Sequence, residues 1–368
     1  MDLAFLHSLY EHPGPWASVY VSTSRHTEAT PQERHLTALA LSRDLAGQGA
    51  DDATCRAVRD ALDELRHSTE PHGRALFACA GEVVLNPALA RSPQVDSAHW
   101  GPLPHTAPLL ELAGEDPVCV VAYVDRKGAA FELRTALGRE DAGSVEGRQH
   151  PVHRTSTVDW SERHFQLKVE NTWEHNAAEI ADALTVCQEE TQADLLILVG
   201  DDQQRRTVHE RLPGRLHDRV VEAPHGTGSR LLEEDVEQAR AEHVRQRAER
   251  ELERFLAARE PDDAGRAGAV EGVPALIEAA REHRISELLI RPDGPDAHRE
   301  VWIGEDPDQV AVRRGDLKIL GERHAWAARA DDALIRSAVV TGAGALSVAP
   351  AGADAVPAGG MGALLRWA

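Results

Sequence analysis

Histidine and arginine side chains gather in one short stretch of the chain, "RQHPVHRTSTVDW", at residues 148–160. The residues that could bind a ligand there are His150, His153, Arg154 and Thr155. Imidazoles can ligate a metal ion, but metal sites usually add a carboxylate or a cysteine at a set spacing, which this stretch lacks. We therefore expect neither a metal site nor a catalytic set in this segment.

Two carboxylates form a second candidate site. Asp201 and Asp202 end the strand-like run "LLILVGDD", where parallel α/β sheets often bind ligands. They could hold magnesium or a nucleotide, although a solvated turn is the simpler interpretation. The glycine-rich "HGTGSR" at residues 225–230 lacks the lysine and the spacing of a phosphate loop. The sequence thus indicates no cofactor.

A long helical pattern follows the histidine-rich stretch. Its apolar residues fall within an arc of about 120°, which predicts one buried face. They are Phe165, Val169, Trp173, Ala177, Ile180, Leu184 and Cys187. Asp159 and Glu162 form a predicted N-cap pair, and the helix should end near Gln192. At about 1.5 Å per residue it would be roughly 45 Å long. Such a helix could carry its loop to a distant contact, or it could be a core helix that follows an ordinary surface loop.

Strand and helix patterns predict an α/β protein of three domains. These are an N-terminal α/β domain at residues 1–113, a middle domain at 114–259 and a smaller α/β domain at 260–368. The middle domain should hold a doubly wound, largely parallel sheet with the long helix projecting from it. We interpret the proline-rich "GPLPHTAPLLELAGEDP" as a linker and "EPDDAGRAGAVEG" as the second boundary.

Composition limits the possible partners. The formal net charge is −21, which argues against sequence-independent binding to DNA or RNA, since that binding depends on basic side chains. No apolar run approaches the roughly 20 residues that span a bilayer, and the N-terminal residues do not resemble a signal peptide. The four cysteines, Cys55, Cys79, Cys119 and Cys187, have no close pairs. They suit reduced thiols, so we expect a cytoplasmic protein without membrane contact.

Several stretches resemble the class-1 release factor and Pelota family of archaea and eukaryotes. The resemblance is greater to its bacterial branch, which includes the Balon-type ribosome hibernation factors of actinobacteria and other bacteria. It covers about residues 115–368 and rests on "VVAYVDRKGAAFEL", the loop with its long helix, "ADLLILVGDD", "GVPALIEAAREHRISELLI" and "GGMGALLRW". In the last of these, Gly359, Gly360, Gly362 and Arg366 match the closing glycine-rich strand of the family.

The resemblance implies a stress-response protein that occupies the vacant A site, contacts ribosomal RNA of both subunits and protects idle ribosomes. It also implies elongation factor Tu as a candidate partner. In release factors the loop before the long helix carries a Gly-Gly-Gln triplet that positions a water; this chain has "HPVHRTSTVDW" instead. We therefore expect no peptidyl-tRNA hydrolysis and no enzyme activity. His150, His153, Arg154 and Thr155 would then contact ribosomal RNA at the peptidyl transferase centre.

Two alternatives remain open. The protein could be a rescue or peptide-release factor that acts on stalled ribosomes. It could also be a stress-related small-molecule or nucleotide-binding enzyme that uses Asp201 and Asp202. A solvated loop without any ribosomal contact is the simplest structural alternative for the histidine-rich stretch.

Overall fold

The chain forms two compact units of mixed helix and strand. The computed structural model describes residues 3–23, 31–68, 72–113, 117–135, 138–146, 160–223, 231–263, 265–319, 321–322, 324–348 and 357–367, with the backbone alone at 66 and 160–172. The smaller unit is Asp116–Arg245, and the larger unit joins Met1–Glu115 to Gln246–Ala368. The predicted α/β class is confirmed. The division into three domains at residues 1–113, 114–259 and 260–368 stays a prediction.

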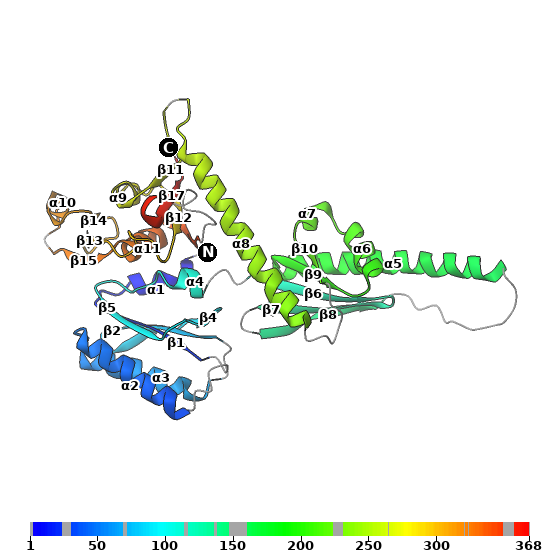
Figure 1. The fold of residues 1–368 in the computed structure, drawn as a ribbon, viewed down its shortest axis with the longest axis horizontal. Coiled ribbons are helices and arrows are strands. Elements are labelled where there is room, and N and C mark those ends of the chain that lie inside the picture. Colours follow the sequence, from blue (N-terminus) through cyan, green and yellow to red (C-terminus); the bar gives the residue numbers. More distant parts are fainter. Residues whose placement is uncertain are drawn as a thin grey trace. The chain divides into compact units, whose positions relative to one another are not determined.

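The smaller unit is built on one five-stranded sheet of order β10-β9-β6-β7-β8 (Figure 1). The strands are β6 (Cys119–Asp125), β7 (Gly128–Thr135), β8 (Gly138–Glu146), β9 (Leu195–Val199) and β10 (Val220–Glu222). β6, β9 and β10 run parallel, whereas β7 pairs antiparallel with both β6 and β8. The parallel part of the predicted sheet is therefore limited to three strands, because only two residues separate β6 from β7 and β7 from β8, and such short connections join antiparallel neighbours.

Helices cover both faces of this sheet, as a doubly wound fold requires. The helices are α5 (Trp160–Thr191), α6 (Asp202–Arg211), α7 (Gly214–His217) and α8 (Leu231–Arg259). Side chains of α5, α6 and α7 share one apolar cluster with alternate residues of β6 and β9. The other residues of the same strands pack against Leu232, Val236 and Ala239 of α8. Strands buried on both sides explain the uninterrupted apolar run at Leu195–Val199.

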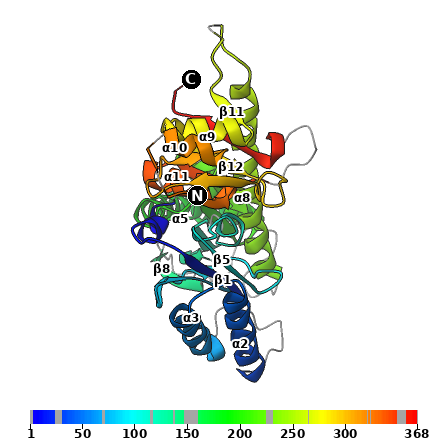
Figure 2. The same ribbon diagram turned by 90° about the vertical axis from the view of Figure 1, so that its left-hand side faces the viewer.

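The N-terminal part of the larger unit is an antiparallel sheet with two helices on one face. Its elements are η1 (Ala4–Leu6), α1 (His7–Tyr10), β1 (Trp16–Ser22), α2 (Pro31–Gly47), α3 (Asp52–Glu64), η2 (Leu65–His67), β2 (Gly73–Cys79), β3 (Glu82–Leu85), β4 (Ala88–Leu89), β5 (Ser97–Gly101) and α4 (Leu109–Leu112). The strand order is β3-β2-β1-β5, with β4 also paired to β2. α2 and α3 lie side by side on this sheet (Figure 2).

The C-terminal part of the larger unit holds two further sheets. Its elements are β11 (Ala269–Glu271), α9 (Val273–Arg281), β12 (Ile285–Ile290), β13 (Glu300–Ile303), β14 (Val310–Ala311), α10 (Arg314–Ile319), β15 (Trp326–Arg329), α11 (Ala330–Thr341), β16 (Gly344–Ser347), η4 (Ala358–Gly360) and β17 (Met361–Leu365). The sheet orders are β11-β17-β12-β16 and β14-β13-β15. α9 and α11 pack on one face of the larger sheet, and Leu252 and Phe255 of α8 pack on the other.

The closing glycine-rich segment has a packing role. Gly360 has a φ of 86°, a conformation that other residues adopt only under strain. A Cβ at Gly362 would lie 2.6 Å from the Phe255 ring, so only glycine lets β17 approach α8 this closely. Arg366 donates a hydrogen bond of 2.6 Å to the Thr341 carbonyl. Backbone conformation, close packing and a hydrogen bond therefore explain the residue types at Gly360, Gly362 and Arg366.

The proline-rich segment at residues 101–117 is not a linker over most of its length. Leu103, Thr106, Leu109 and Leu110 are buried, and the three leucines belong to the apolar core that also contains α9 and α11. The linker prediction is wrong here, because prolines exclude regular hydrogen-bonded structure but do not prevent apolar side chains from packing.

All four cysteines are buried free thiols. Among the described residues, each helix is too short or too polar to cross a lipid bilayer.

The packing of α5 generates a stability prediction. Leu184 is fully buried, so Leu184→Ala should destabilise the smaller unit by about 2.5 to 5 kcal/mol. Val186 lies on the same helix but is 52% exposed, so Val186→Ala should change stability by less than about 0.5 kcal/mol. Hydrogen exchange of the β9 amides under native conditions measures this unit separately from the larger one. Equal protection in the two variants would contradict the packing.

Candidate functional site

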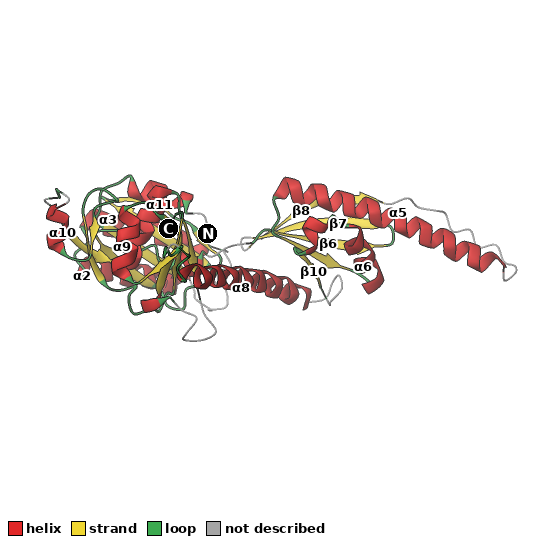
Figure 3. Cartoon of the chain, turned by 90° about the horizontal axis from the view of Figure 1, so that it is seen from above, coloured by secondary structure: helices red, strands yellow, loops and turns green. Residues whose placement is uncertain are grey.

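The helix α5 is anchored at its C-terminal end. Ala177, Ile180 and Leu184 are fully buried against the sheet, and Cys187 is nearly so, as their spacing predicts. Trp173 lies at the edge of this cluster and is half-buried. The predicted burial of Phe165 and Val169 falls on residues whose side chains are outside the description. The helix continues in the N-terminal direction beyond the strands of its own sheet (Figure 3).

Polar contacts also fix this end of α5. The Asn176 side chain donates a hydrogen bond of 3.2 Å to the carbonyl of Arg126, in the turn between β6 and β7. The Gln188 side chain donates one of 3.1 Å to the Ala193 carbonyl, just before β9. Because both partners lie beside strands of the sheet, the direction of α5 is set by apolar packing and hydrogen bonds together.

The predicted RNA-contacting residues lie outside the described residues. His150, His153, Arg154 and Thr155 belong to residues 147–159, which precede α5. The predicted N-cap residue Asp159 lies there too. Their contacts with RNA therefore stay predictions from the sequence. The structure describes only the helix α5 that follows them.

The strand-end carboxylates have structural partners. The Asp201 side chain caps α6 by accepting a hydrogen bond of 3.1 Å from the backbone N–H of Gln203. Asp202 is exposed and pairs with Arg205 at 2.5 Å. Arg205 also donates to the Gly200 carbonyl and to that of Ala223, which ties the end of β9 to the segment after β10. Capping and pairing account for both carboxylates without a nucleotide or a metal ion.

A buried ionic cluster joins the two parts of the larger unit. The Asp332 carboxylate accepts hydrogen bonds from the backbone N–H groups of Thr106 at 2.9 Å and Ala107 at 3.2 Å. Its other oxygen lies 2.9 Å from the His105 Nδ1. The neighbouring Asp331 is bound by both arms of Arg329, at 3.0 and 2.5 Å. The cluster holds the segment before α4 to the first turn of α11.

The same cluster has the spacing of a metal site. His105, Asp331 and Asp332 offer ligand atoms within 4.8 Å of one another. However, both oxygens of Asp331 are bound by Arg329, and both oxygens of Asp332 accept hydrogen bonds or pair with His105. A guanidinium at this place would repel a divalent cation. The arrangement therefore favours a closed ion network over a metal centre.

Sequence reasoning missed this cluster. Its members come from "PLPHTAP" and "ARADDALIRS", which are far apart in the chain. One signal was present: Asp331 and Asp332 begin a helix whose other residues are mostly apolar, and such a helix is buried on several sides. Carboxylates in that setting need partners.

Residues 118–261 match the model of bacterial archaeo-eukaryotic release factor family 2. The match contains the whole sheet of the smaller unit together with α5 and α8. Residues 118–261 belong to this release factor family. The matched region contains the long helix α5 and the strand β9 that follows it, as the sequence resemblance implied.

Two relatives and two solved structures are similar to this chain. The uncharacterized proteins Rv2629 and MT2704 of two Mycobacterium tuberculosis strains are each 27% identical over 358 residues, which cover 96% of this chain and 94% of the relative. The archaeal translation termination factor aRF1 is 20% identical, covers 98% of this chain and 96% of its own, and has a TM-score of 0.24. Archaeal Pelota, from a model of ribosome-bound Pelota and ABCE1, is 14% identical, with coverage of 98% and 93% and a TM-score of 0.41.

The buried cluster predicts a pH-dependent stability. Burial alone would lower the pKa of His105, but the Asp332 carboxylate beside it raises that pKa above its usual 6.5. The folded state thus binds this proton more tightly than the unfolded chain does. The resulting stabilisation is complete below about pH 6.5 and is lost as the pH rises through the folded-state pKa. The stability difference between the parent protein and His105→Asn should therefore shrink over that range in urea unfolding experiments.

The pKa of the neighbouring His99 is shifted in the opposite direction to that of His105. Its pKa is lowered by burial and by the neighbouring His105, so it contributes a stability that grows with pH. Burial, the larger cause, acts on His99 in both proteins and should cancel in the comparison, whereas the smaller contribution of His105 is removed by the substitution. A difference between parent and His105→Asn that stays constant from about pH 5 to pH 9 would contradict the ion pair with Asp332.

Proposed function

We propose that this protein binds the ribosome and occupies a vacant A site as a protection factor. Two observations support the proposal. Residues 118–261 belong to a release factor family. Within them, α5 has 32 residues and is anchored at one end, so the loop before it would be carried away from the packed sheet.

The sequence of that loop favours occupancy over hydrolysis. Hydrolysis of an ester needs a group held within hydrogen-bond reach of the attacking water. The release factors that the loop resembles use two glycines followed by glutamine. Here Gln149 follows Gly147 and Arg148, and no glycine occurs from residue 148 to residue 158. We infer that the arginine and histidine side chains contact ribosomal RNA instead, since arginine binds phosphate in a fork.

The loop carries the first test of this function. Replacing residues 148–158 by a glycine–serine segment of equal length should leave the stability of the smaller unit within about 0.5 kcal/mol, because polar surface loops contribute little to a core. Binding to vacant ribosomes, measured by sedimentation, should nevertheless weaken. Chemical probing of the large-subunit RNA should lose any protection that the parent protein gives at the peptidyl transferase centre.

A single substitution gives a finer measure. Arg154→Ala should weaken ribosome binding by about 1 to 3 kcal/mol, the usual range for a lost charge-assisted hydrogen bond. Arg206 is exposed on α6 without a side-chain partner among the described residues, so Arg206→Ala is the matched control. Binding by the parent should also weaken as salt rises, because phosphate contacts release counterions. Equal binding by parent, loop replacement and Arg154→Ala would eliminate the proposed role of the loop.

Peptide release provides the second test and separates the main alternative. Ribosomes with a labelled peptidyl-tRNA should release peptide in the presence of this protein no faster than without it. Gln149→Ala should make no difference to this background rate. Release that is faster with the parent and is lost in Gln149→Ala would instead establish a peptide-release or rescue factor.

A further inference from the structure

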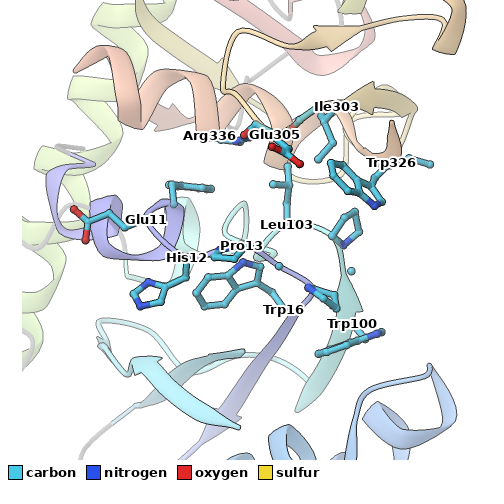
Figure 4. A pocket seen from close by; sticks show the side chains of 17 residues that line it. Glu11, His12, Pro13, Trp16, Trp100, Leu103, Ile303, Glu305, Trp326 and Arg336 are labelled. Carbon is cyan, nitrogen blue, oxygen red and sulfur yellow. Dashed lines mark hydrogen bonds between the residues drawn. The ribbon is translucent and has the colours of Figure 1, made fainter. Parts of the chain in front are cut away.

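A pocket of about 800 Å³ opens in the larger unit (Figure 4). Its walls come from residues 10–16, 100–103, 303–305 and 326–327, together with Arg336 of α11. The volume is within the range of pockets that bind small molecules. The pocket lies outside residues 118–261, so membership of the release factor family assigns it no ligand.

Trp326 brings exposed aromatic surface to this pocket. Its side chain is 43% exposed, although it stands in β15 opposite Ile303 of β13, which is buried. The His324 ring stacks on the indole at a centroid distance of 6.5 Å and an interplanar angle of 26°. Figure 4 shows the indole of Trp326 and the carboxylate of Glu305 directed toward the same space. The indole and a carboxylate therefore line the same pocket.

The charges at the pocket are mostly negative. Glu11 and Glu305 line it, are exposed and have no side-chain hydrogen bond or ion pair among the described residues. Asp306, next in the chain, is also exposed and carries a further carboxylate. An anionic ligand would meet repulsion from these groups, whereas a cation would supply the partner that they lack.

Arg336, the positive group that lines the pocket, is occupied by the protein itself. Its guanidinium donates a hydrogen bond of 3.0 Å to the Gly304 carbonyl and another to the Glu305 carbonyl. It is 8% exposed, and burial lowers its pKa. Its role is to hold the loop after β13, and it thereby places the Glu305 side chain at the pocket.

We propose that this pocket binds an arginine side chain of a basic polypeptide partner. A guanidinium is flat, so it can stack on the Trp326 indole while its N–H groups bind the Glu305 carboxylate. An aromatic face combined with an unpaired carboxylate favours this cation over a neutral or acidic group. The rest of the volume accommodates the peptide backbone on either side. The inference stands on the larger unit alone and does not depend on the proposed ribosomal function.

The test uses the full-length protein and two blocked peptides that differ at one kind of side chain. One is an acetylated and amidated arginine–glycine repeat; the other carries citrulline, a neutral isostere, in place of each arginine. Indole N–H signals of isotope-labelled protein, assigned by substitution, identify which tryptophans respond. The arginine peptide should shift the Trp326 signal and should bind about tenfold more tightly than the citrulline peptide.

Substitutions locate the binding. Trp326→Ala and Glu305→Gln should each weaken binding of the arginine peptide by about fivefold or more. Trp367, 54% exposed near the chain end, and Glu300, exposed on β13, lie outside the pocket and supply the controls Trp367→Ala and Glu300→Gln. These controls correct for general attraction to a protein of net charge −21. Glu305 and Glu300 are both exposed, so Glu305→Gln and Glu300→Gln should fold normally.

Several results would overturn the proposal. These are equal binding of the two peptides, an unshifted Trp326 signal at millimolar peptide, and an equal loss in the pocket variants and the controls. A shift of Trp326 by an oligonucleotide in preference to the arginine peptide would assign an anionic ligand and would also overturn it.

Discussion

The buried carboxylate of Asp332 is the constraint on which the larger unit depends. A carboxylate removed from water is costly unless donors surround it. The donors are backbone N–H groups of Thr106 and Ala107, together with His105, and all three come from the N-terminal part of the chain. α11 can thus bury its first turn only when residues 105–107 are in place. The pocket beside Trp326 has walls from both parts of the unit, so it depends on their association, to which this contact and a shared apolar core both contribute.

The smaller unit solves a different problem with apolar packing. α5 must be held at one end strongly enough for the remainder to continue beyond the sheet. Helices in proteins gain most of their stability from tertiary contacts, so the anchored residues from Asn176 to Gln188 support the turns that precede them. The α8 helix covers the opposite face of the same strands. Removing either layer would expose a strand such as Leu195–Val199, which is apolar along its whole length.

The sequence predicted those features that depend on residues close together in the chain. The periodicity of Ala177, Ile180 and Leu184 identified the buried face of α5, because a helix with one apolar stripe must turn it toward a core. The segment around Leu109 was misinterpreted as a linker, because its burial depends on α9 and α11, which are distant in sequence. The partnership of His105 with Asp332 has no local signature for the same reason. The RNA contacts predicted for His150, His153, Arg154 and Thr155 rest on resemblance, since these residues lie outside the described part of the chain.

Charge distribution connects the two proposals. A protein with a net charge of −21 cannot approach RNA over a broad surface, because its own carboxylates would repel the phosphates. Its RNA contacts would have to be confined to a short segment without acidic residues, and residues 148–158 are such a segment. The same acidity is an advantage where the partner is a basic polypeptide, as proposed for the pocket at Glu305 and Trp326. A partner assembly that presents both phosphates and arginine-rich protein would therefore engage the two units through opposite charges, and each contact would discriminate against the ligand of the other.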